Sequence, residues 1–331
     1  MYRRFLNKND YLGIITEDAL SQLTRGKDIC FVQAEQAAEA SIMDYLTENY
    51  EIERDRQMRK SIAIIITSIL VLSGCNKQQS VSDRLLNEVE KAIAINPDSA
   101  SNLLKSISSP EKLDDKAFAR WCMLSGKITD EIFNSILPTY QLERAYDWYS
   151  SHGSPDEQVQ ILIYLGRSYF ADGDYDKAMS IYTNALDIAE KNKLNNLIGY
   201  TYDYIGDLYR EKFMRTEAIK RYEIAAEYFK KEKNTDSYAC ALRDIGREYA
   251  QMDSLSHALN ILIIADSVAA NTSNINVTAS INNALGNIYS MQNKYDKAEE
   301  YLLKALLTGR EKMPDYVALI DLYTASNSIN K

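Results

Sequence analysis

Small and apolar positions recur at one fixed distance along the second half of this 331-residue chain. Four glycines lie 40 residues apart; a tyrosine follows each after three positions, and alanines follow after 12 and 19 positions. Apolar residues at helical spacing around these positions are typical of helices that bury one face. The pattern therefore predicts four 40-residue helix pairs over residues 156–310, built around Gly166, Gly206, Gly246 and Gly286, Tyr169, Tyr209, Tyr249 and Tyr289, Ala178, Ala218, Ala258 and Ala298, and Ala185, Ala225, Ala265 and Ala305.

The residue types predict how the helices of each pair meet. We expect the glycine and the first alanine to lie at a close helix crossing, where a larger side chain would push the backbones apart. The residue four positions after that alanine should fill the space beside the crossing (Tyr182, Tyr222, Leu262 and Leu302). Turns are expected between the paired helices at 172–174, 252–254 and 292–294, where Gly, Asp, Asn and Ser gather.

Two segments, LGRSYFADGDYDKAMSIYTNAL and LGNIYSMQNKYDKAEEYLLKAL, resemble the tetratricopeptide repeat almost throughout. The resemblance implies an all-α fold, a right-handed solenoid of antiparallel helix pairs. A period of 40 residues exceeds the usual length of about 34. We expect longer helices rather than long loops, because the extra residues are rich in Lys, Glu and Asn and contain no Pro.

Weaker helix pairs flank the four repeats. Residues 82–155 predict degenerate repeats: a helix over 85–95, a turn over 96–100 and a second helix, then a pair over 117–127 and 142–151. Residues 316–323 resemble the first helix of a further, partial repeat over 311–331. An array that ends in half a repeat leaves an apolar face uncovered, which suggests a truncated chain.

A lipoprotein signal is predicted at 58–75. Met58-Arg59-Lys60 precedes an apolar run over 61–73, and Leu72-Ser73-Gly74-Cys75 resembles the lipobox of bacterial lipoproteins. The run is short for a transmembrane helix, which needs about 20 residues; the alternative is a buried core helix. The resemblance implies that Cys75 carries a diacylglycerol group, that 76–81 form a tether, and that the protein is anchored in the bacterial cell envelope, on the periplasmic side or at the outer membrane.

Residues 1–57 stand before this signal, where a signal normally begins the protein. Residues 1–53 resemble the start of a small phage family associated with the head-tail connector region, through Glu17-Asp18-x-Leu20-x-x-Leu23-Thr24 and a helix over 34–50. We expect a small helical segment here. It arises either from a reading frame joined to its upstream neighbour or from a start codon placed too early.

The stretch from Met58 onward resembles the tetratricopeptide-repeat lipoproteins of Bacteroidetes, with an early Asn96-Pro97-Asp98-Ser99-Ala100 turn. In many relatives the repeats precede a transmembrane helix, a coiled coil and an output or DNA-binding region. The resemblance implies a scaffold, or the truncated sensor part of a signalling regulator. A second alternative is a glycan-binding lipoprotein of the starch-uptake type, which needs exposed aromatic platforms; the chain has only Trp121 and Trp148, both in helical segments that we expect to be core.

Charge and reactive side chains narrow the function. The net charge of −9, without a basic block, argues against nucleic acid as a partner. The four Cys and two His have no metal-ligand spacing, and no nucleophile stands beside a base in a known motif. We therefore expect no metal, no cofactor and no catalysis, but a protein or peptide partner, besides a membrane contact through the lipid.

Candidate partner-binding positions lie three before and one after each glycine, on the concave side of the first helices. Of these, Arg243, Arg247, Asn283 and Asn287 form a candidate site for a carboxylate such as a peptide C-terminus. The alternative is an ion-pair lattice of little energetic value, in which Asp203 and Asp207 neutralise the two Arg. The full stripe is Ile163, Arg167, Asp203, Asp207, Arg243, Arg247, Asn283 and Asn287, with Tyr164, Tyr200 and Tyr204 as aromatic contact area.

Overall fold

The computed structural model describes residues 82–132, 136–309 and 313–329. The chain separates into two compact units, Met1–Ser80 and Val81–Lys331, and the described residues belong to the second. The segment over 1–57, the signal over 58–75 with Cys75, and the tether over 76–81 lie outside the described residues. The described part is helical and contains no strand.

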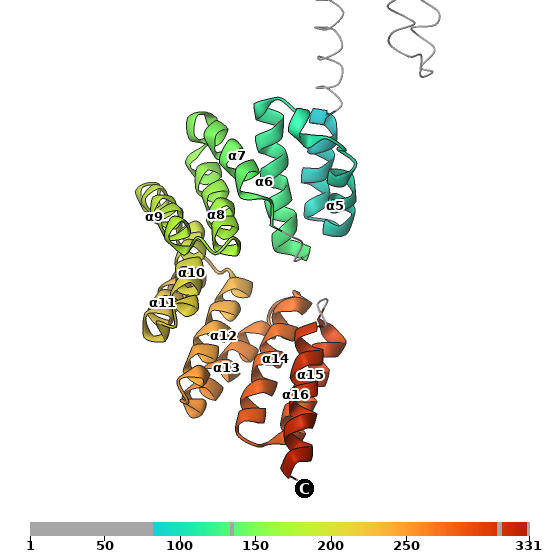
Figure 1. The fold of residues 1–331 in the computed structure, drawn as a ribbon, viewed down its shortest axis with the longest axis vertical. Helices are drawn as coiled ribbons and strands as arrows, with labels where there is room; N and C mark the ends of the chain where they lie inside the picture. Colours follow the sequence, from blue (N-terminus) through green and yellow to red (C-terminus); the bar gives the residue numbers. More distant parts are fainter. Residues whose placement is uncertain (1–81, 133–135, 310–312, 330–331) are drawn as a thin grey trace, which may run out of the picture. The chain divides into compact units, whose positions relative to one another are not determined.

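Helices follow one another in chain order in antiparallel pairs (Figure 1). Residues 82–93 form the first described helix. The helices after it are α5 (Pro97–Lys105), α6 (Asp115–Ile132), α7 (Thr139–His152), α8 (Pro155–Ala171), α9 (Tyr175–Lys191), α10 (Asn195–Glu211), α11 (Arg215–Lys231), α12 (Thr235–Gln251), α13 (Leu255–Ala269), α14 (Ile275–Met291), α15 (Tyr295–Thr308) and α16 (Met313–Ile329), with a short 3-10 turn at Pro110–Lys112.

The 40-residue period comes from long helices and short turns, as predicted. The helices α8 to α12 and α14 have 17 residues each. Three residues connect most neighbours, including the expected turns at 172–174, 252–254 and 292–294. The middle residue of these turns has a positive φ of 56° to 79° (Gly173, Lys193, Phe213, Lys233, Asp253 and Asn293). This left-handed residue closes the preceding helix, because the next N–H can then donate to a carbonyl of its last turn.

The repeat glycines lie at the predicted close crossings. A Cβ atom added to Gly206 would stand 2.5 Å from the Tyr222 ring, and one added to Gly286 would stand 2.6 Å from Leu302. Both distances are far inside van der Waals contact, so only a hydrogen atom fits. The tyrosine or leucine of the second helix thus occupies the space that the glycine leaves, which confirms the predicted pairing.

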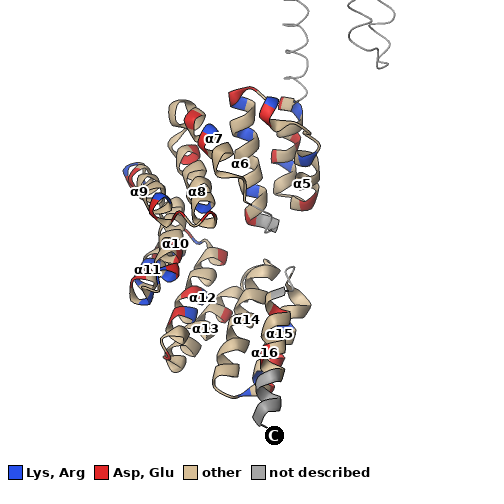
Figure 2. Cartoon of the chain, viewed as in Figure 1, with Lys and Arg blue, Asp and Glu red and all other residues tan. Residues whose placement is uncertain are grey.

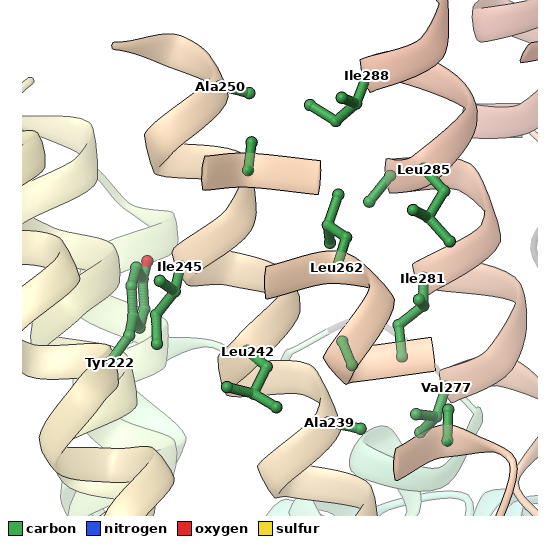
Figure 3. Packing of buried hydrophobic residues seen from close by; sticks show 14 of the residues in the cluster. Tyr222, Ala239, Leu242, Ile245, Ala250, Leu262, Val277, Ile281, Leu285 and Ile288 are labelled. Atoms are coloured by element: carbon green, nitrogen blue, oxygen red, sulfur yellow. The ribbon is translucent and has the colours of Figure 1, made fainter. Parts of the chain in front are cut away.

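Small residues and branched apolar residues build a core between successive pairs. The largest cluster joins α11, α12, α13 and α14 and includes Tyr222, Leu262, Ile281 and Leu285, all at most 1% exposed (Figure 3). A second cluster joins α6, α7 and α8. Each cluster connects neighbours in the chain, which is the packing of a solenoid.

The first described pair differs from the prediction in its turn. Residues 97–100 were expected in the turn but form the start of α5. Asn96 caps this helix, since its side chain accepts the N–H of Ser99 at 3.0 Å, and Pro97 occupies the first helical position, where no N–H is needed. The helices predicted at 117–127 and 142–151 are present and longer, as α6 and α7.

Within the described residues, no helix combines the length and the apolar character needed to cross a bilayer.

Candidate partner-binding groove

A cavity of about 720 Å³ lies along the first helices of the repeats. First helices contact one another directly, α8 with α10, α12 with α14 and α14 with α16, so they form an inner layer. The cavity walls come from α12, from α14 and the two residues before it, from Gly309, from the start of α16, from residue 130 of α6 and from residues 93, 94 and 97. The α14 helix has no charged residue (Figure 2). The charges of this cavity therefore come from its other walls, chiefly from α12 (Arg243 and Arg247), with Asp130 and Asp315.

Two guanidinium groups on α12 share one carboxylate. Arg243 donates to both oxygens of Asp244, at 3.0 Å from Nε and 2.6 Å from Nη2, and donates from Nη1 to Ser280 on α14 at 3.0 Å. Arg247 reaches the same carboxylate only at 3.5 Å. Its side chain remains 42% exposed. The Arg243 group is thus held in place, whereas Arg247 has most of its donors available to a ligand.

The close contact of these three groups shifts the pKa values of Asp244 and Arg247. Burial tends to raise the pKa of Asp244, but Arg243 and Arg247 outweigh it and hold that pKa below its ordinary value. Burial, together with repulsion from Arg243, lowers the pKa of Arg247 to about 10. Arg247 thus has a partly desolvated charge beside a like charge, and an added anion would offset both effects.

The acidic positions on α10 behave unlike each other. Asp207 forms an ion pair with Arg210 at 2.7 Å and accepts a hydrogen bond from the Tyr222 hydroxyl at 2.8 Å. Burial nevertheless raises its pKa to about 6. The Oδ1 atom of Asp203 is enclosed and has no hydrogen-bond partner among the described residues. Burial first, and then the carboxylates of Asp207 and Asp244, raise the Asp203 pKa well above its ordinary value.

Arg167 and the predicted aromatic residues are engaged inside the protein. Arg167 pairs with Asp130 of α6, which also accepts from the Tyr164 hydroxyl at 3.1 Å. Tyr204 stacks on the Tyr182 ring at 5.8 Å, with the Arg167 guanidinium 5.3 Å from the Tyr204 ring. These rings hold α8, α9 and α10 together. They add little free surface to the cavity.

Tyr200 is also a packing residue. Its ring meets Phe229 edge-on at 4.9 Å, and Asn234 and Ser237 lie within hydrogen-bond distance of its hydroxyl, at 3.1 and 2.9 Å. It therefore joins α10 to α11 and to the start of α12.

The structure divides the predicted Arg and Asn group. Arg243 and Arg247 line the cavity together, and Asn283 lines it as well. The Asn283 amide, however, donates to Asp315 at 2.7 Å, and the exposed Asn287 donates to Asn283 at 3.0 Å. Ile163, on the same stripe, is buried. Of the predicted stripe, the two Arg are the residues that combine a charge with a place on the cavity wall.

The ion pairs also differ from the predicted lattice. Asp207 pairs with Arg210 and the two Arg pair with Asp244, so each pairing stays within one helix. Asp244, the partner of both Arg, is 6% exposed and was not among the predicted residues. A carboxylate at a core-facing position needs partners, and an Arg directly before it and three residues after it supplies them. That signal was available in the sequence.

Both tryptophans pack against the core and are not exposed on the surface. Trp121 and Trp148 are partly buried against the core cluster of α6 to α8, as expected. Neither forms an exposed platform for a sugar ring.

Two segments of the chain match family models of the tetratricopeptide repeat, residues 162–195 and 278–313. The photosystem I assembly protein Ycf3 of Rippkaea orientalis is 32% identical over 91 residues, which are 27% of this chain and 52% of that protein. The match thus spans about half the length of this relative.

Solved structures show the same fold at low identity. A Rap protein complexed with the competence and sporulation factor has a TM-score of 0.59 and 18% identity, covering 95% of this chain and 78% of that one. NprR in complex with its cognate peptide NprX has a TM-score of 0.55 and 12% identity, covering 96% and 84%. The chain accordingly has the fold of an all-α tetratricopeptide-repeat solenoid.

Proposed function

From this solenoid as the premise, we propose that the protein is a non-catalytic scaffold or sensor module that holds a peptide or protein partner in the groove formed by the inner helices. The partner's carboxylate, at a C-terminus or on an acidic side chain, binds at Arg247 with Arg243 beside it. One observation carries the proposal. Two guanidinium groups on the wall of a 720 Å³ cavity have a single carboxylate, Asp244, between them.

The arrangement suits a carboxylate for a physical reason. An Arg presents two parallel N–H groups that match the two oxygens of a carboxylate. Asp244 and Ser280 already fix Arg243, so little side-chain freedom is lost there on binding. The cavity volume is within the usual range for ligand sites, about 300 to 1,000 Å³. NprR, which has a similar fold, binds a cognate peptide, and this supports a peptide as the partner class.

The test compares two pools of synthetic random peptides, one with free C-terminal carboxylates and one amidated. We expect the full chain to retain the free pool more strongly, and Arg247→Gln to reduce that retention roughly tenfold or more, the usual effect of a charged hydrogen bond. The salt dependence of retention should also flatten. Lys231→Gln, an exposed residue at the end of α11, is the matched control for net charge. If wild type and Arg247→Gln retain the free-carboxylate pool equally, the proposed site is contradicted.

Membrane attachment through Cys75 is the second part of the proposal, and its support is the lipobox-like Leu72-Ser73-Gly74-Cys75 after a short apolar run. An acyl chain contributes about 0.8 kcal/mol per buried methylene, so a diacylglycerol group would hold the protein in the cell envelope. Expression from Met58 should give a membrane-bound product whose mass spectrum shows a lipid-modified N-terminal Cys75. Cys75→Ser should abolish the modification. An unmodified Cys75 inside a soluble, unprocessed product would contradict the anchor.

A further inference from the structure

We propose that the groove couples anion binding to a proton: Asp203 holds a proton when an anion lies against Arg247 and Arg243, and releases it when the site is empty. This inference rests on the proposed function, since it concerns the regulation of the same site. It starts from the enclosed Oδ1 atom of Asp203, which has no partner among the described residues.

An enclosed carboxylate oxygen without a hydrogen bond is costly when it is charged. Either a nearby cation or a bound proton can lower this cost. The cations near Asp203 are already engaged, Arg210 by Asp207 and Arg243 by Asp244. A proton on Asp203 is therefore the way to lower the cost that leaves the neighbouring ion pairs intact.

Asp203 is surrounded by other charged and titratable groups on each packed helix. They are Tyr204, Asp207 and Arg210 on α10, Cys240, Arg243 and Asp244 on α12, and Tyr182 on α9. Arg243 and Asp244 in turn interact with Arg247, the exposed end of the cluster. Asp203, Asp207 and Asp244 together oppose Arg210, Arg243 and Arg247, so the cluster is balanced when all six are charged. Protonation of Asp203 leaves one positive charge in excess, on the wall of the cavity.

The sign of the coupling follows from this count. A proton on Asp203 favours an anion at Arg247, and by reciprocity an anion at Arg247 raises the proton affinity of Asp203 by the same factor. Anion affinity should therefore rise as the pH falls through the range in which Asp203 titrates. Burial and the neighbouring carboxylates raise the pKa of Asp203 well above its ordinary value, which moves this range from strong acid toward neutral pH.

The test uses sulfate as the probe, because sulfate keeps its double charge across the pH range and any pH dependence then belongs to the protein. Binding to the full chain is measured through the sulfate-induced rise of the thermal midpoint, against chloride at equal ionic strength. We expect sulfate to bind wild type roughly 5-fold or more tightly at about pH 6 than at about pH 8, the usual size of a coupling. Asp203→Asn should bind at about pH 8 nearly as tightly as wild type does in acid, and the small pH dependence that is left should belong to Asp207, whose pKa is about 6.

Two further variants separate the possible failures. Asp187→Asn removes the same charge from an exposed position on α9 and should keep the wild-type pH dependence. Arg247→Gln should weaken sulfate at every pH. If Arg247→Gln weakens sulfate but wild type shows no pH dependence, or if Asp203→Asn keeps the full dependence, the coupling is wrong and the proposed function stands. If sulfate does not bind, or binds without Arg247, both fail.

A stability measurement without any ligand adds an independent check. An acid whose pKa is raised in the folded state binds more protons when folded, so the contribution of Asp203 to stability should fall as the pH rises above the ordinary carboxyl pKa of about 4. Asp203→Asn carries no such charge. It should be at least as stable as wild type at about pH 7, with a shallower pH profile. A less stable variant with an unchanged profile would show that Asp203 is ionised in the folded protein.

Discussion

At the scale of single residues, the turns contain the most unusual backbone of the described chain. Phe213 has a φ of 57° and is 79% exposed. A residue with a Cβ atom in this left-handed region costs about 1 to 2 kcal/mol, while a glycine there costs only its chain entropy. We therefore expect Phe213→Gly to raise the free energy of unfolding by about 0.5 to 1 kcal/mol, measured by urea denaturation.

The converse substitution is the control. Gly173 occupies the equivalent turn position with a φ of 79°, and an added Cβ atom would meet nothing within 4 Å. Gly173→Ala tests the backbone alone, and it should lower stability by about 1 kcal/mol. If both substitutions shift stability in the same direction, the left-handed conformation is not the cause.

At the scale of the helix, the close crossings limit side-chain size. Gly206→Leu on α10 would drive a side chain into the Tyr222 ring of α11, and overpacking of this kind costs about 1 to 3 kcal/mol. The thermal midpoint should fall accordingly. Pairing Gly206→Leu with Tyr222→Ala should recover part of the loss, because the ring no longer occupies that space. If the double variant loses as much stability as the two single variants together, Gly206 and Tyr222 do not meet at the crossing.

The same scale shows what the sequence could predict. Glycine, alanine and tyrosine at a constant spacing determine which helix faces meet, because each contact is local and repeats. The crossings and the three-residue turns were therefore predicted correctly. The partners of charged side chains were not, since several rotamers of Arg243 fit the same helix, and the choice depends on Asp244 and on Ser280 of the next repeat. The start of α5 differs from the prediction, because Pro97 begins this helix instead of belonging to the turn before it.

At the scale of the whole described unit, cohesion comes from contacts between chain neighbours. Separate core clusters join α6 to α8, α11 to α14, and α14 to α16. In such an array the total stability is close to a sum over neighbouring interfaces. The sequence could predict this organisation from the period alone. It could not predict the cavity, because the cavity walls include Ile93 and Pro97 as well as Pro314 and Asp315, which are far apart in the chain.

The left-handed turn residues recur every 20 positions from Gly173 to Asp253, and this spacing bears on how such a protein evolves. Excision or duplication of one 40-residue unit, such as 195–234, joins equivalent turns and leaves both flanks in register. Each unit contributes one pair of residues to the inner stripe, acidic at 203 and 207, basic at 243 and 247, and amide at 283 and 287. Gain, loss or exchange of whole units in the gene would therefore change the order of charges along the inner stripe one pair at a time. The ligand preference would then change while the helical scaffold stays the same.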